Sequence, residues 1–140
     1  MQRGMLVTLL LFTTVFISGC ALCPQIDSQQ KLIMQFDDYM IPLAKAVDVI
    51  ADQLPQDATD QEIFSEAIRR SGNPGLLSPF NGNVLKARIQ NGVGVILLCT
   101  PDGREAIIED VTCTTRPDAW RPPGSPCIYL LDAERVCSSK

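Results

Sequence analysis

Histidine is absent from this chain of 140 residues. Histidine is the side chain most often used as a general base and as a metal ligand, so its absence removes much of acid–base and metal chemistry. Any catalytic cysteine would lack a histidine partner. The sequence also holds no phosphate-binding glycine loop, no serine in a nucleophile-elbow pattern and no carboxylates at metal-loop spacing. These absences predict a protein that is not an enzyme and that carries no metal and no other cofactor.

Basic residues are also few, since 12 Lys and Arg stand against 16 Asp and Glu. An acidic balance argues against binding to nucleic acid and against electrostatic attachment to anionic lipids. A membrane-spanning run is missing too. The N-terminal apolar run from Met5 to Ile17 has 13 residues, whereas a spanning helix needs roughly 20. A run of this length behind a cationic start with Arg3 is typical of a cleaved signal peptide.

The apolar run ends in Ile17-Ser18-Gly19-Cys20, where two small residues precede a cysteine. This motif resembles the lipobox of bacterial lipoproteins, and the resemblance covers residues 1–20 only. It implies cleavage between Gly19 and Cys20, a diacylglycerol thioether on the Cys20 sulfur, and a new amino terminus acylated, for example, with palmitate. Several acyl chains on one residue anchor a protein stably in a membrane. The alternative is an ordinary secretory signal in which Cys20 is incidental.

The same resemblance implies a location and a division of the chain. Ala21 follows the cysteine in place of the aspartate that is associated with inner-membrane retention, so the outer membrane is favoured over the inner one. We expect a signal peptide over residues 1–19, a lipidated tether over residues 20–27 and a single domain over residues 28–140. Cleavage removes one basic residue, leaving 11 basic and 16 acidic residues and a net charge of −5. Attachment to the membrane then depends on the lipid alone.

A long amphipathic helix is predicted over residues 28–54. Asp27 and Gln30 form a capping-box pattern at its start, and Pro42 inside it predicts a kink. Such a helix could pack on a sheet of its own chain, or its apolar seam could join two copies as a coiled coil. The stripe on one face of this helix comprises Ile33, Phe36, Met40, Leu43, Val47, Ile50 and Leu54.

A shorter helix follows. Thr59 and Glu62 form a second capping box at its start, and Gly72 is placed to end it. A short connector between two helices predicts an antiparallel hairpin. In the loop after the second helix, Leu76, Leu77 and Phe80 are expected to fill the core.

The next segment predicts an antiparallel meander of three strands. Asn91-Gly92 is typical of a two-residue hairpin turn, and residues 100–103 read as a type I turn with a bulge. These turns would place Ala87 opposite Ile96, and Ile96 opposite Ile108. The three strands cover residues 84–90, 93–100 and 104–113.

Alternation of side chains gives this sheet one apolar and one mixed face. The apolar face, expected to lie against the helices, collects Leu85, Ala87, Ile89, Ile96, Leu98, Ala106 and Ile108. The mixed face carries Lys86, Arg88, Val95, Leu97, Cys99, Glu105 and Glu109. The C-terminal segment is expected to cover it, with residues 114–126 irregular, 127–131 a fourth strand and 132–137 one helical turn or an irregular end. The predicted fold is therefore α+β: a two-helix hairpin packed on an antiparallel meander of three to four strands, braced by disulfides.

Six cysteines in an exported chain indicate disulfides. With Cys20 lipidated and Cys23 left over, four remain. The predicted register places Cys99 opposite Glu105 and far from Cys113, which excludes that pair. We favour Cys99–Cys137 with Cys113–Cys127, because the latter closes the irregular Pro/Arg loop. Cys99–Cys127 with Cys113–Cys137 is the alternative.

One segment has the composition of a binding surface: Arg116, Trp120 and Arg121 lie in a proline-rich loop, and Trp and Arg are enriched at the centres of interfaces. We nevertheless favour the interpretation that Trp120, the only tryptophan, covers the mixed sheet face. Glu105 and Glu109 could form a polar groove, but surface charge is the favoured interpretation.

The sequence therefore predicts a non-enzymatic, membrane-anchored envelope lipoprotein that binds another protein as an accessory or assembly factor. A first alternative is a small inhibitor that blocks an enzyme with the Trp120 loop. A second is a cell-envelope hydrolase whose carboxylates, such as Glu105 or Glu109, form an unrecognised site.

Overall fold

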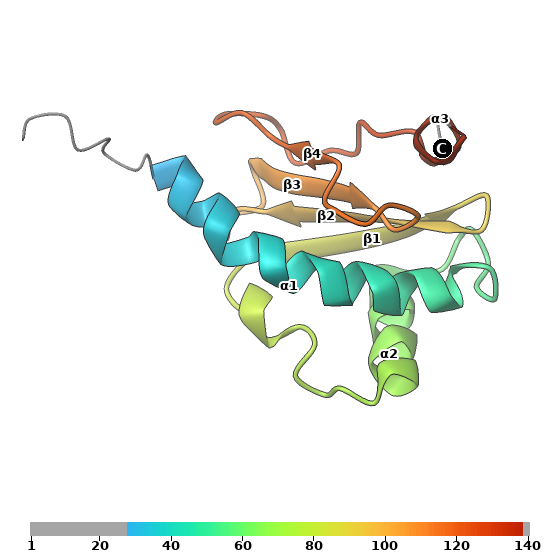
Figure 1. Cartoon of the computed structure of the whole chain (residues 1–140). Coiled ribbons are helices and arrows are strands. Elements are labelled where there is room, and N and C mark those ends of the chain that lie inside the picture. The colour runs from blue at the N-terminus through green and yellow to red at the C-terminus, as the bar shows by residue number, and fades with distance from the viewer. Residues whose placement is uncertain (1–27, 139–140) are drawn as a thin grey trace, which may run out of the picture.

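The structure, a computed structural model, describes residues 28–138. The lipobox with Cys20, the tether over residues 20–27, Cys23 and the cap residue Asp27 lie outside the described residues. The fold is α+β and has three layers, with α1 and α2 on one side of a sheet and the chain after β4 on the other (Figure 1). The elements in chain order are α1 (Ser28–Ala51), α2 (Asp60–Ser71), the 3₁₀ turn η1 (Ser78–Phe80), β1 (Val84–Gln90), β2 (Val93–Cys99), β3 (Ala106–Val111), β4 (Ala119–Trp120) and α3 (Ala133–Cys137).

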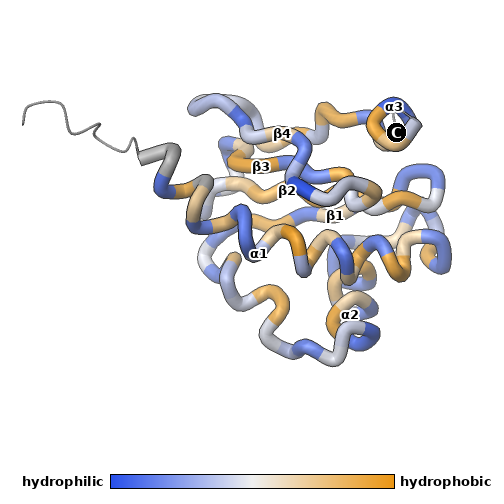
Figure 2. Tube along the Cα trace, viewed as in Figure 1, coloured by the Kyte–Doolittle hydropathy of each residue, from blue (hydrophilic) through white to orange (hydrophobic). Residues whose placement is uncertain are grey.

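The predicted apolar stripe of α1 forms the centre of the core. One helix runs through Pro42, which is exposed, and ends at Ala51 rather than at the predicted Leu54. Apolar residues run along the central strands opposite this helix, whereas polar residues gather on loops and outer helix faces (Figure 2). Because the stripe is covered by the chain's own sheet, it is not free to serve as a seam between two copies. Its fully buried members are Phe36, Met40, Leu43, Val47 and Ile50.

The second helix begins and ends as predicted. The Thr59 hydroxyl accepts the N–H of Glu62, and the Glu62 carboxylate accepts the N–H of Thr59 at 2.8 Å, so both halves of the capping box are present. Gly72 ends α2 with φ at 66°, a left-handed conformation that costs glycine little. In the following loop Phe80 is buried and stacks on Phe36 of α1, with 5.9 Å between ring centroids. The hairpin and the loop therefore share one core.

The first strand pair has the predicted register, with Ala87 opposite Ile96. The second pair does not. Ile96 lies opposite Asp110, and Ile108 lies opposite Leu98, so the prediction that Ile96 faces Ile108 is wrong. The shift equals two residues, so these side chains keep their predicted faces, and Ile96 and Ile108 both lie in the helix-side core.

The second register differs because the turn is longer than predicted and a β-bulge adjoins it. The N–H of Thr100 donates to the carbonyl of Glu105 at 2.8 Å, which closes a wider loop than the predicted one. The bulge then leaves Ile107 as an extra residue opposite β2. As a result Cys99 lies opposite Ala106, not Glu105, and Ala106 packs on the outer face of the sheet. The prediction that Ala106 faces the helices is therefore wrong.

A fourth strand exists, but not where the sequence predicts it. Residues 127–131 form no strand, whereas β4 lies within residues 114–126 and pairs with β3. Strand β4 has only two residues and lies between proline-rich segments, so the sequence does not indicate it. The N–H of Arg121 continues the pairing by donating to the carbonyl of Ile107 at 3.0 Å. The expectation that the C-terminal segment covers the mixed sheet face is confirmed. It packs on Val95, Leu97 and Cys99 through Cys127, Tyr129, Leu131 and Ala133.

The four predicted cysteines form two disulfides, but the favoured pairing is wrong. Cys99 bonds to Cys127 and Cys113 to Cys137, with 5.8 and 6.0 Å between the Cα atoms. The reason is the path of the chain after β3. Strand β4 runs antiparallel to β3 and returns the chain to the Cys99 end of the sheet, where the N–H of Cys127 donates to the Arg104 carbonyl at 2.9 Å. The chain then recrosses the outer face and brings Cys137 to the Cys113 end.

Candidate functional site

Trp120 does not cover the mixed sheet face. It lies in β4 opposite Ile108 of β3, and residues opposite one another in an antiparallel pair project from the same face. The indole therefore packs, half-buried, against the helix-side core. The favoured interpretation from the sequence is wrong because it treated residues 114–126 as a loop without a sheet register.

Beside Trp120 lies a half-open pocket with a volume of about 170 Å³. A cavity of about 150 Å³ holds a benzene-sized molecule, so this pocket has room for one large apolar side chain. Its polar boundary is formed by Thr100, Glu105 and Arg121. Its apolar lining comprises Leu32, Ala106, Ile107, Trp120 and Pro123.

Arg121 borders this pocket, but its charged group is directed inward. Its side chain is 9% exposed and forms an ion pair with Glu109, which is 0% exposed. Burial lowers the pKa of Arg121 from its ordinary value. The Glu109 carboxylate also accepts the backbone N–H groups of Leu130, at 3.1 Å, and Leu131, at 2.9 Å. The pair therefore joins the sheet to the C-terminal segment, and the interpretation of Glu109 as a surface charge is wrong. Glu105, in contrast, is exposed.

Arg116 is exposed and lies apart from the other two predicted contact residues. It borders a shallow depression with Ile41, Lys45 and Asp110, on the α1 side of the loop after β3. The structure thus brings Trp120 and Arg121 to one pocket and places Arg116 at another.

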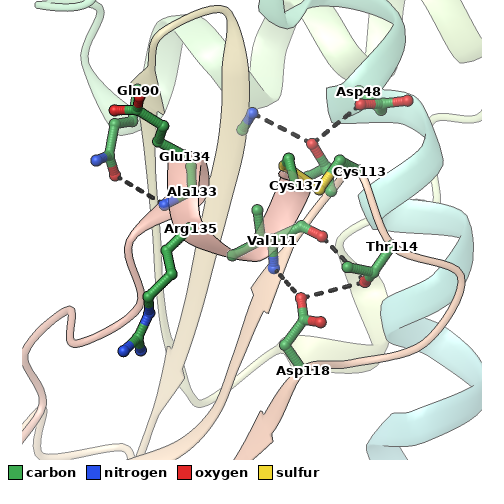
Figure 3. The surroundings of a disulfide bond; sticks show 12 residues. Asp48, Gln90, Val111, Cys113, Thr114, Asp118, Ala133, Glu134, Arg135 and Cys137 are labelled. Carbon is green, nitrogen blue, oxygen red and sulfur yellow. Dashed lines mark hydrogen bonds between the residues drawn. A yellow bond between two sulfur atoms is a disulfide. The ribbon is translucent and has the colours of Figure 1, made fainter. Parts of the chain in front are cut away.

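A buried aspartate, Asp110, lies at this second place beside the exposed Asp118, and the sequence reasoning missed it. Asp110 is 2% exposed, and burial, followed by the nearby charge of Asp118, raises its pKa to about 8. Asp118 accepts the Val111 N–H at 2.8 Å and the Thr114 hydroxyl at 3.1 Å (Figure 3). A signal was present in the sequence. Glu109 and Asp110 are adjacent in a strand, so one of them had to face the helices.

A second cation also fixes the C-terminal segment. The guanidinium of Arg88 lies 4.4 Å from the centre of the Tyr129 ring and donates to the Leu131 carbonyl at 3.0 Å. Burial raises the pKa of Tyr129 above its ordinary value, because the phenolate would be poorly solvated there. With the two disulfides, these contacts hold the outer layer in one arrangement.

Comparisons with known proteins add no assignment: no family model, no curated protein and no solved structure matches this chain. Within residues 28–138, no group of three or more acidic, cysteine or histidine side chains is arranged to hold a metal ion. No helix in that part of the chain is long and apolar enough to cross a membrane.

Proposed function

We propose that this chain is a lipid-anchored envelope lipoprotein, in the outer rather than the inner membrane, that binds another protein and is not an enzyme. The lipobox motif Ile17-Ser18-Gly19-Cys20 supports the anchor. The pocket beside Trp120 is the observation that carries the binding role. We infer that it receives one apolar side chain, of the size of Leu or Phe, from an envelope protein.

The pocket has the properties of an interface centre. Tryptophan is enriched among the residues that dominate binding energies. Trp120 is held by the pairing of β4 with β3, and the adjoining Arg121 by its ion pair with Glu109. A partner would therefore order little of this surface on docking, which reduces the entropic cost of association.

The distance to the anchor limits where the partner can be. Leu32, in the pocket wall, follows Cys20 by 12 residues. The eight residues from Cys20 to the start of α1 at Ser28 can span at most about 3.5 Å each, and the four helical residues from there to Leu32 add about 1.5 Å each. The pocket therefore lies within about 35 Å of the lipidated residue. The partner is thus a membrane protein or a protein held close to the membrane surface.

The two alternatives are less well supported. A hydrolase that used Glu109 would need a carboxylate that can reach substrate, but Glu109 is fully buried against Arg121 and two backbone amides. An inhibitor with a protruding Trp120 loop would need an exposed indole, but Trp120 is half-buried in a sheet.

A photocrosslinking experiment tests the binding role. A photoreactive residue replaces Leu32 in the anchored protein, and a matched control carries it at Val49, an apolar residue of the same helix that is 61% exposed and outside the pocket. In native membranes, the Leu32 probe is expected to form a discrete adduct at least about fivefold more abundant than that of the control. Adding Trp120→Ala should abolish that adduct. Equal adducts from both positions, or an adduct indifferent to Trp120→Ala, would contradict the proposal.

A further inference from the structure

The two disulfides interleave along the chain. Cys99 bonds to Cys127 across 28 residues and Cys113 to Cys137 across 24, so each bridge links a cysteine to its second neighbour among the four. We propose that the chain reaches this pairing by thiol–disulfide exchange with an envelope disulfide isomerase, a dithiol protein that binds its misoxidised form. The inference rests on the export that the proposed function includes.

Loop lengths favour the wrong bonds before folding. Only 14 residues separate Cys99 from Cys113, and 10 separate Cys127 from Cys137. Closure probability falls as about the −3/2 power of loop length, so doubling a loop lowers it about threefold. The two consecutive bonds together are therefore favoured about tenfold over the two native bonds in an unfolded chain. Oxidation that precedes folding would yield Cys99–Cys113 and Cys127–Cys137.

The misoxidised chain cannot correct itself by folding. Cys99 lies opposite Ala106, and Val111, two residues before Cys113, is already about 17 Å from Ala106 along β3. Bridged Cα atoms lie within about 7 Å of one another. A Cys99–Cys113 bond is therefore incompatible with the β2–β3 pair.

The second native bond depends on the last helix of the chain. Figure 3 shows Cys137 of α3 bonded to Cys113, while the N–H of Ala133 donates to the Gln90 side chain at 3.4 Å. Until the chain from Cys127 to α3 is in place, the outer sheet face with Leu97 and Val95 remains uncovered. This apolar surface is what an isomerase would bind.

The exchange needs no net oxidant. The isomerase thiolate attacks the Cys113 sulfur, which breaks Cys99–Cys113, forms a mixed disulfide and releases the Cys99 thiolate. That thiolate attacks the Cys127 sulfur, forming Cys99–Cys127 and releasing the Cys137 thiolate. The Cys137 thiolate then attacks the Cys113 sulfur of the mixed disulfide, forming Cys113–Cys137 and restoring the isomerase thiolate.

The test expresses the full chain in a Gram-negative host and in the same host without its periplasmic disulfide isomerase. Every form carries Cys23→Ser, so that this thiol cannot shuffle the bonds. Non-reducing peptide mapping gives the pairing, and intact mass gives signal processing. The control also carries Cys99→Ser and Cys127→Ser, which leaves Cys113 and Cys137 as a pair with no competing partner among the four.

In the host without the isomerase, the Cys99–Cys113 and Cys127–Cys137 peptides should outnumber the native peptides roughly tenfold, whereas the native peptides should predominate in the host that has it. The Cys113–Cys137 bond of the control should form equally in both hosts. Native pairing in equal yield in both hosts would overturn the need for an isomerase while leaving the proposed function intact. An unprocessed chain with reduced cysteines in both hosts would overturn the inference together with the proposed export.

Discussion

The buried carboxyl group of Asp110 should make the stability of this domain fall as pH rises. Its pKa is about 8 in the folded state, against 3.8 for an ordinary aspartate, because burial and the charge of Asp118 disfavour the carboxylate. The polar groups around the Asp110 carboxyl are Asp118 and Thr114, both from the chain after β3, and Lys45 of α1. Arg116 lies at the edge of the same depression. Asp110 is 2% exposed, so solvent screens the effect little.

The sign and the size follow from proton linkage. Between pH 4 and pH 8 the folded state holds a proton that the unfolded state has lost, so the free energy of unfolding decreases as pH rises. The decrease is about 1.4 kcal/mol per pH unit, or about 3 kcal/mol between pH 5 and pH 7, and it ends above about pH 8. Asp110→Asn keeps the shape and removes the titration. The variant should therefore lose this slope and be the more stable protein at pH 8.

Urea denaturation of the wild type and of Asp110→Asn at pH 5, 7 and 9 measures this effect. Asp102→Asn is the matched control, because Asp102 is exposed and its pKa is lowered, chiefly by the hydrogen bond from the Thr100 hydroxyl, rather than raised. Parallel stability curves for the wild type and Asp110→Asn, or a wild type that gains stability from pH 5 to pH 7 relative to the variant, would refute the reasoning.

Two further predictions concern the core and the outer layer. Leu43→Asp buries an unpaired carboxylate and should cost several kcal/mol of unfolding free energy. The control Val49→Asp, on the exposed side of α1, should cost under about 0.5 kcal/mol. Comparable shifts in melting temperature for the two variants would contradict the assigned core. Arg121→Leu leaves the Glu109 carboxylate buried without its cation and should cost about 3–5 kcal/mol by denaturant titration. A loss below about 1 kcal/mol would show that this ion pair does not hold the C-terminal segment.

The local features of the fold could be predicted because each has a short-range signal. The Thr59–Glu62 capping box, the left-handed Gly72 and the Asn91-Gly92 turn are all fixed by a few neighbouring residues. The apolar stripe of α1 was equally readable, since helical periodicity determines which side chains share a face.

The features that were missed depend on contacts between distant segments. The bulge at Ile107 changes a register that the turn sequence alone does not encode. The two-residue β4 has no periodicity, so neither the place of Trp120 nor the return of the chain to Cys99 could be read from composition. Burial of Glu109 depends on Arg121 and on the later segment that covers both. The candidate pocket combines α1, β3 and β4 and was accordingly not predicted.

The intact mass of the protein from the membrane fraction tests the lipid anchor, on which the proposed function depends, most directly. We predict that the wild type begins at Cys20 and carries a diacylglycerol group and an amide-linked acyl chain. Cys20→Ser should retain residues 1–19 and carry no lipid. A wild-type chain cleaved to its mature length with no acyl mass would contradict the anchor and the location that follows from it.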